Sequence, residues 1–196
     1  MGVLYQIVQT ITLHEDLVEQ FSYQINNSIY KLAKTYRYIE TLWIEGKIEY
    51  QTASIDRSDL LDEIFDKLKK DVRLQAYDIY KIIGDEVTCD DKKDFFLNLI
   101  ESQFVTSELS TVLTSTAPLE TITNILSSTE PNISEKASTY LHVIHKIAQV
   151  LNSINQSKLG EFPFQQIEEC LDELQGIGIE VKQGQLFHID LWNPIT

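Results

Sequence analysis

The stretch from residue 13 to residue 45 constrains the fold most, because apolar side chains recur through it at intervals of three and four. No glycine or proline interrupts the pattern before Gly46. Read as one helix, it would run for roughly thirty residues, against an average of about eleven. A helix of that length needs a partner along its apolar side, because propensity alone gives an isolated helix little stability. The recurring residues are Val18, Phe21, Ile25, Ile29, Leu32, Tyr36, Ile39 and Trp43.

Helical periodicity continues along most of the remaining chain. After an extended connector at 47–55, residues 61–83 carry a second long apolar stripe that ends at Gly84, a residue suited to a helix C-terminus. The pattern predicts a mainly α fold, a multi-helix antiparallel bundle with two or three long helices and short helices in the middle. Further helices are expected at 1–13, from about 90 to 104, at 105–113, 119–126, 137–154 and 164–174.

The C-terminal tail changes its period from helix to strand. Apolar residues alternate from Ile177 to Val181 and again from Phe187 to Leu191, with Gly184 between the two runs. A three-residue turn would place Ile179 opposite Phe187 and keep one apolar face, so a small β-hairpin is expected. Residues 1–131 are therefore expected to form the helical bundle. Residues 132–196 would add a long helix, a short helix and the hairpin, packed on the bundle as one domain.

Charge and composition limit the partners of this chain. It has 196 residues with 16 basic against 30 acidic side chains, a formal charge of −14. Such a surface repels nucleic acid and anionic membranes. No apolar run approaches the roughly twenty residues of a membrane span, and the first residues lack a signal-peptide pattern. Cys89 and Cys170 match no metal or redox motif and are expected to be free thiols. A cytoplasmic protein is the expectation.

The sequence carries no recognised catalytic motif. His142 and His145 stand three apart on one expected helix, but two ligands leave a zinc site incomplete. The Glu-x-x-His, zincin, nucleophile-elbow and phosphate-loop patterns are all absent. We therefore expect no catalytic residue, metal or cofactor. The alternative is a helical enzyme or small-molecule binder with a site between helices near these two histidines.

A second alternative is a winged-helix transcription factor, because residues 134–192 combine helices with a terminal hairpin. Its recognition helix would carry Glu168, Glu169, Asp172 and Glu173 with no lysine or arginine. That charge disfavours contact with phosphates.

The function that the sequence favours is a protein–protein interaction module, acting as an adaptor, regulator or assembly subunit. Tyr23, Tyr30 and Tyr38 lie beside or off the apolar stripe of the first expected helix. An apolar ring with a polar tip suits a partly wet interface. These three tyrosines are the candidate interface, and the expected partner is another protein or a second copy of the chain.

Overall fold

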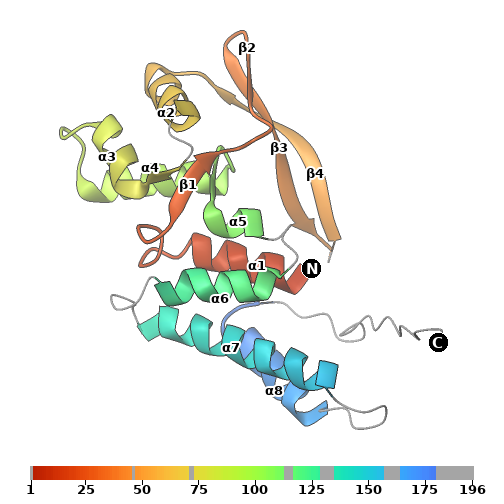
Figure 1. Ribbon diagram of the computed structural model, residues 1–196. Helices are drawn as coiled ribbons and strands as arrows, with labels where there is room; N and C mark the ends of the chain where they lie inside the picture. Colours follow the sequence, from red (N-terminus) through yellow and green to blue (C-terminus); the bar gives the residue numbers. More distant parts are fainter. Residues whose placement is uncertain are drawn as a thin grey trace.

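The fold is mixed α/β, with helices around two small antiparallel sheets (Figure 1). The computed structural model describes residues 2–45, 47–70, 73–112, 117–128, 135–156 and 164–179. The predicted mainly α, all-helical bundle is therefore wrong, because residues 22–56 form strands.

The elements follow one another along the chain in a mixed order. The helices are α1 (Gly2–Thr12), α2 (Asp59–Lys70), α3 (Ala76–Ile83), α4 (Cys89–Glu101), α5 (Glu108–Val112), α6 (Pro118–Ser128), α7 (Glu135–Gln156) and α8 (Phe164–Gly176). The strands are β1 (Ser22–Ile25), β2 (Tyr30–Leu32), β3 (Thr35–Ile44), β4 (Lys47–Asp56), β5 (Leu74–Gln75) and β6 (Val105–Ser107).

The long helix predicted over residues 13–45 is replaced by turns and the strands β1, β2 and β3. The reason lies in the side chains of β3: seven of the ten residues in Thr35–Ile44 are β-branched or aromatic, and such residues favour a pleated surface. Tyr36 and Tyr38 are buried while Arg37 and Ile39 are exposed, which is the two-residue period of a strand. The helical spacing of apolar residues coincided with a strand pattern.

The upper sheet has the order β2-β3-β4, and β3 pairs with β4 along its whole length, from Thr35 opposite Asp56 to Ile44 opposite Lys47. Helix α2 covers the inner face of this sheet (Figure 1). The ring of Tyr36 lies between Phe65 of α2 and Phe104, with centroid distances of 5.0 and 5.2 Å. Aromatic packing therefore holds the sheet against the core.

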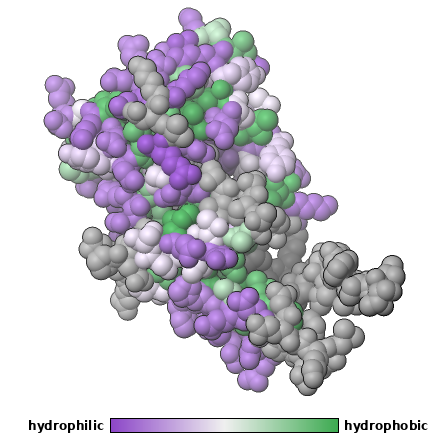
Figure 2. Space-filling model, in the orientation of Figure 1, coloured by the Kyte–Doolittle hydropathy of each residue, from purple (hydrophilic) through white to green (hydrophobic). Residues whose placement is uncertain are grey.

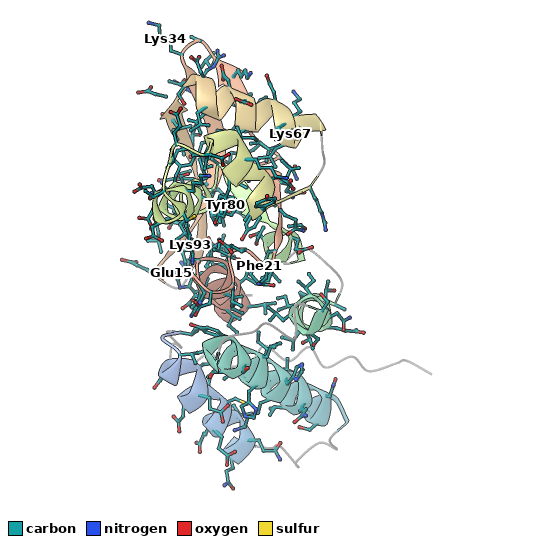
Figure 3. The ribbon with its side chains drawn as sticks, turned by 90° about the vertical axis from the view of Figure 1, so that its left-hand side faces the viewer. Glu15, Phe21, Lys34, Lys67, Tyr80 and Lys93 are labelled. Carbon is teal, nitrogen blue, oxygen red and sulfur yellow. The ribbon has the colours of Figure 1, made fainter. Side chains whose placement is uncertain are left out.

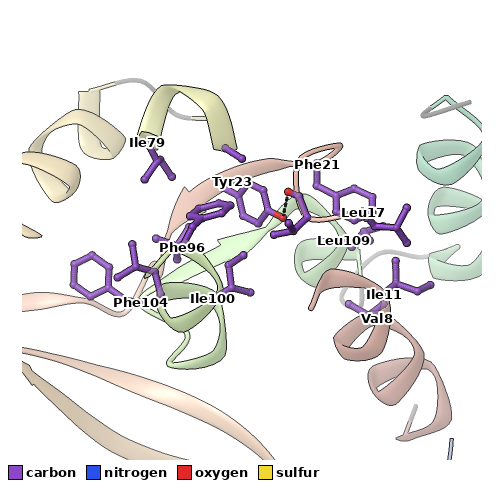
Figure 4. Packing of buried hydrophobic residues seen from close by; sticks show 14 of the residues in the cluster. Val8, Ile11, Leu17, Phe21, Tyr23, Ile79, Phe96, Ile100, Phe104 and Leu109 are labelled. Atoms are coloured by element: carbon purple, nitrogen blue, oxygen red, sulfur yellow. Dashed lines mark hydrogen bonds between the residues drawn. The ribbon is translucent and has the colours of Figure 1, made fainter. Parts of the chain in front are cut away.

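The second sheet has the order β5-β1-β6, and its central strand β1 runs through the main core (Figure 4). Tyr23 is fully buried on β1, where its ring meets the edge of Phe96 at 4.7 Å. Its hydroxyl donates a 2.7 Å hydrogen bond to the carbonyl of Val18. The one polar atom of this large side chain is thus satisfied inside the core.

Two further helix predictions need correction. The second long helix, predicted over 61–83, is divided into α2 and α3 by the short strand β5, although Gly84 does follow the last turn, with φ of 94°. The stretch 105–113, predicted as a short helix, begins with β6 before α5. In both places a short strand pairs with β1, a long-range contact that helical periodicity does not report.

Helices α6, α7 and α8 form a layer beside α1, at the end of the molecule away from the upper sheet (Figure 1). All three were predicted from their apolar periodicity. Leu126, Leu141, Ile144 and Leu174 join the same hydrophobic cluster as Ile7 of α1. The predicted hairpin falls largely on residues 180–196, which lie outside the described residues.

Candidate functional site

On the side of β3 away from β4, strand β2 pairs only with Thr35 to Arg37, and side chains bind the backbone further along. Beyond the short strand β2, Ile39 donates its N–H to Ser28 Oγ at 2.8 Å and accepts Asn26 Nδ2 on its carbonyl at 3.1 Å. Two residues on, the side-chain amide of Gln103 accepts the N–H of Thr41 at 2.8 Å and donates to its carbonyl at 2.7 Å. We call these backbone groups of Ile39 and Thr41 the sealed edge.

The sealed edge fixes which backbone groups of β4 are free. In an antiparallel pair, successive residues turn their N–H and C=O to opposite sides. The backbone N–H and C=O groups of Ile39 and Thr41 point away from β4, so those of Tyr38 and Glu40 point towards it. Tyr38 and Glu40 pair with Ala53 and Gln51 of β4. The alternate residues of β4, such as Thr52, therefore turn their backbone N–H and C=O groups away from β3. The free edge, as we call it, comprises the backbone of Ile48, Tyr50, Thr52, Ser54 and Asp56.

The free edge faces outwards at the margin of the sheet. In Figure 1, β4 is the outermost strand, and no other described strand pairs with its far side. Tyr50 is 72% exposed and Ile39, on the same sheet face, is 49% exposed. The space-filling view shows apolar and polar residues interleaved over this part of the molecule, whereas α7 and α8 present mainly hydrophilic residues (Figure 2). Five outward-facing N–H groups and five outward-facing C=O groups stand in a row there, and a further strand could pair with them.

A polar cluster stands at the far end of the free edge, where the chain leaves β4 and enters α2. Arg57 holds Asp62 through two hydrogen bonds, from Nε at 3.0 Å and from Nη2 at 2.6 Å. The hydroxyl of Tyr36 donates to the same carboxylate at 2.5 Å. The hydrogen bonds from Arg57 and then from Tyr36 hold the pKa of Asp62 well below its usual range.

The same cluster raises the pKa of Tyr36 and forms one wall of a shallow hollow. Burial is the larger cause of the raised pKa of Tyr36, and the hydrogen bond to Asp62 adds to it. Lys31 approaches both Asp62 and Asp66, at 3.8 and 3.4 Å. These contacts fix the start of α2 against the sheet. The hollow is lined by Ala33, Lys34, Arg57, Ser58, Asp59 and Asp62.

The three candidate interface tyrosines have different surroundings. Tyr23 lies in the core with no exposed area, and Tyr38 is 2% exposed, with its ring edge-on to Phe104. Tyr30, on β2, is 50% exposed on the outer face of the upper sheet, opposite Arg37. The structure therefore does not bring the three side chains together on one surface.

The candidate histidines lie elsewhere. His142 and His145 are both exposed on α7, on the layer opposite the upper sheet. Within the described ranges, His, Cys, Asp and Glu side chains form no group of three suited to a metal ion. Cys89 is exposed and Cys170 is buried, and both are free thiols.

The described helices also include none that is long and apolar enough to cross a bilayer.

Sequence reasoning missed the free edge, because it assigned β3 to a helix and β4 to a connector. One signal was available: Lys47–Asp56 lacks glycine and proline and contains Ile48, Tyr50, Thr52 and Ile55, residues typical of strands. Gly46, a residue type that is common in turns, stands between two such runs in the sequence. The sequence therefore indicates a hairpin at this point, but it does not predict that the side chains of Asn26 and Gln103 bind the backbone of β3.

Comparison with known proteins gives one family and one similar fold. The family model described as "Lantibiotic dehydratase, N terminus" matches residues 1–196. The crystal structure of the tRNA-dependent lantibiotic dehydratase MibB from Microbispora sp. 107891 is similar, with a TM-score of 0.71 and 12% sequence identity. The similarity covers 91% of this chain and 17% of that one. No curated protein matches the chain.

Proposed function

The chain belongs to the lantibiotic dehydratase N-terminal family, and from this premise we propose that it binds an extended peptide as an additional strand along the free edge of β4. A dehydratase of lantibiotics has a peptide as its substrate, so one part of such a protein must hold peptide chain. Among the described edge strands, β4 is the longest, so its free edge offers the longest row of backbone groups to a peptide. The observation that supports the proposal is the row of outward-facing groups from Ile48 to Asp56.

Strand addition suits a substrate with a variable sequence. Main-chain hydrogen bonds supply the affinity whatever the peptide sequence, and side chains on alternate positions supply the selectivity. On the outer face, a bound peptide would lie beside Ile48 and Tyr50, which offer apolar and aromatic surface. On the inner face it would lie beside Glu49 and Gln51, which are polar. An alternation of apolar and polar or basic residues is therefore the peptide pattern that this edge favours.

The charge distribution supports a peptide over a nucleic acid as the ligand of this part of the protein. Residues 28–73, which include the upper sheet and α2, carry nine basic and nine acidic side chains, whereas the rest of the chain carries seven and twenty-one. Figure 3 shows two of these basic residues, Lys34 and Lys67, at the upper end of the molecule. A balanced surface surrounded by acidic ones attracts a neutral or basic peptide and repels phosphates. We also propose a cytoplasmic location, which the free thiols of Cys89 and Cys170 support.

A binding measurement on paired variants tests the proposal. A lantibiotic peptide that has not been dehydrated is labelled with a fluorophore. Its fluorescence anisotropy should rise when the protein is added. Thr52→Pro removes one N–H from the centre of the free edge and should weaken binding about tenfold, because proline also obstructs the approach of a neighbouring strand. Thr52→Ala keeps the backbone donor and should bind as the native protein does.

Two controls decide the result. Labelled transfer RNA, titrated at physiological salt in place of the labelled peptide, should show no comparable rise in anisotropy. Hydrogen exchange should slow at the outward amides Tyr50, Thr52 and Ser54 when the peptide is added. Equal binding by the proline and alanine variants, with no slowing of exchange, would refute strand addition.

A further inference from the structure

We propose that the free edge takes its peptide in one direction, antiparallel to β4, with a basic side chain opposite Asp56 and apolar or aromatic side chains opposite Tyr50 and Ile48. The inference rests on the proposed function, because it concerns the same edge, and it adds a direction and three side-chain positions. The two ends of the free edge differ in chemistry, and that difference supports it.

The side chains of the free edge lie on one face of the sheet, because successive side chains of a strand alternate between faces. Thr52 is opposite Ile39, which is 49% exposed on the outer face, whereas Ile55 is opposite the buried Tyr36. The outer face therefore carries a row of side chains beside which a bound peptide would place every second side chain of its own. The row is Ile48, Tyr50, Thr52, Ser54 and Asp56.

The row is apolar and aromatic at the end near the turn between β3 and β4. Ile48 lies opposite Trp43, whose ring stacks on Tyr5 of α1 at 6.3 Å. The ring of Tyr50 is free for a ligand: it is 72% exposed, and among the described residues none stacks on it or hydrogen-bonds to its hydroxyl. Aromatic and β-branched side chains make the most favourable cross-strand pairs with such residues.

The row is anionic at its other end. The carboxylate of Asp56 is exposed, and no described side chain forms an ion pair with it. Its neighbour Arg57 lies on the opposite face and binds Asp62 at 2.6 Å. Arg37 shares the outer face, opposite Ser54, but it stands on β3, about 10 Å from an added strand. A peptide side chain at this end therefore meets a carboxylate first, and a lysine or arginine fits it.

The direction follows from the hydrogen-bonding pattern of the sheet. Each outward-facing residue presents both its N–H and its C=O, and an antiparallel partner exchanges both bonds with it in the more stable of the two ladders. The other pairs of the upper sheet are antiparallel as well. The peptide then runs from Asp56 towards Ile48. Its basic residue comes six positions before the residue opposite Tyr50 and eight before the residue opposite Ile48.

Two synthetic peptides of identical composition test the direction on the native protein. The first is acetyl-Lys-Ser-Thr-Ser-Thr-Ser-Phe-Ser-Val-amide, and the second has the same residues in reverse order. Chemical shifts of the backbone amides of β4, followed by NMR up to millimolar peptide, measure both affinities. The first peptide should bind about tenfold more tightly, because it alone reaches all three side-chain pairs in the antiparallel direction.

A spin label reads the direction without reference to affinity. A nitroxide on the N-terminus of the first peptide should broaden the amide of Ser54 most, and a nitroxide on its C-terminus should broaden that of Ile48. The opposite pattern would show a parallel strand and would overturn the inference.

A charge exchange tests the pair at Asp56. Asp56→Lys should weaken binding of the first peptide about fivefold, and replacing the lysine of that peptide with glutamate should restore it. Asp172→Lys makes the same change of charge on an exposed residue of α8, away from the upper sheet, and should leave the affinity unchanged. At the other end, Tyr50→Ser should weaken binding about threefold, whereas Tyr50→Phe keeps the ring and should not.

The outcomes separate this inference from the proposed function. Equal affinity of the two synthetic peptides, or binding of neither, overturns the direction. If Thr52→Pro still weakens binding of the lantibiotic peptide, the proposed function stands in either case. Binding of neither synthetic peptide and no binding of the lantibiotic peptide overturn both. Circular dichroism of Asp56→Lys and Tyr50→Ser, matched to the native spectrum, shows that the fold is retained.

Discussion

The two long sides of the upper sheet meet the same physical demand in opposite ways. At the sealed edge, Asn26, Ser28 and Gln103 supply side-chain donors and acceptors to the backbone of β3 where no strand is present. At the free edge, no described side chain does so for β4. A buried backbone group must be paired inside the protein, whereas an exposed one can pair with water or a ligand.

The difference shows which backbone groups are already hydrogen-bonded within the protein and which can pair with another chain. Asn26 is 8% exposed, and its two side-chain atoms reach the backbone of three residues, Ile39, Gln103 and Ser28. The β4 residues that carry the free edge are mostly exposed, as Tyr50 shows. The sealed edge therefore contributes to stability, and the free edge is available for binding.

Two neighbouring residues of β4 distinguish the inward-facing from the outward-facing backbone groups. Ala53→Pro removes an N–H that points at β3 and should lower the free energy of unfolding by about 3 kcal/mol or more. Thr52→Pro removes an N–H that points outwards and should cost less than about 1 kcal/mol. Urea unfolding measures both. Similar losses in the two variants would show that the assignment of outward and inward residues is wrong.

The sealed edge can be tested at its most connected residue. Asn26→Ala should lower the free energy of unfolding by about 3 kcal/mol, because it leaves the Ile39 carbonyl and other buried backbone groups without partners. Its exposed neighbour is a matched control: Asn27→Ala should change stability by less than about 0.5 kcal/mol. A small effect of Asn26→Ala in thermal unfolding would mean that water replaces the side chain.

Acid should weaken the junction between β4 and α2. The pKa of Asp62 is held low in the folded protein, chiefly by the hydrogen bond from Arg57. The carboxylate therefore stabilises the fold at any pH above the ordinary pKa of an aspartate, which is about 4. That contribution is lost as the pH falls from about 4 towards the lower native pKa. Asp62→Asn should therefore be less stable at pH 7 but should lose less stability on acidification. Urea midpoints from pH 7 to pH 3 measure this, with Asp59→Asn as the control; parallel curves for Asp62→Asn and the native protein would contradict it.

The sequence predicted the helices better than the sheets, and the reason is the range of the contacts. Helices α1, α6, α7 and α8 draw their pattern from neighbours three and four residues apart, so Ile122, Leu126, Leu141 and Ile144 were readable as core positions. The helix prediction for β3 is wrong because Tyr36, Ile39 and Trp43 also have helical spacing, which coincides with the two-residue alternation of a strand.

Pairing partners were beyond the reach of the sequence pattern. Gln103 binds the backbone of Thr41 from 62 residues away, and β1 pairs with β6 across a still longer separation, as in Tyr23 with Ser107. Such contacts depend on where the core places the segments, which local spacing does not encode. The free edge followed from those contacts, so the candidate site could not be reached before the fold.

Trp43 places a fluorescent side chain on the hairpin of β3 and β4. Its ring stacks on Tyr5 of α1 at a centroid distance of 6.3 Å, and it sits on β3 opposite Ile48, the first residue of the free edge. The hydroxyl of Tyr5 also donates to the carbonyl of Thr41 at 2.6 Å, so helix and hairpin are tied at this point. The chain has two tryptophans, Trp43 and Trp192. Replacing Trp192 with phenylalanine would leave Trp43 as the single tryptophan, separated by β4 from a chain bound at the free edge. The emission of Trp43 would then report binding at the free edge without an attached dye.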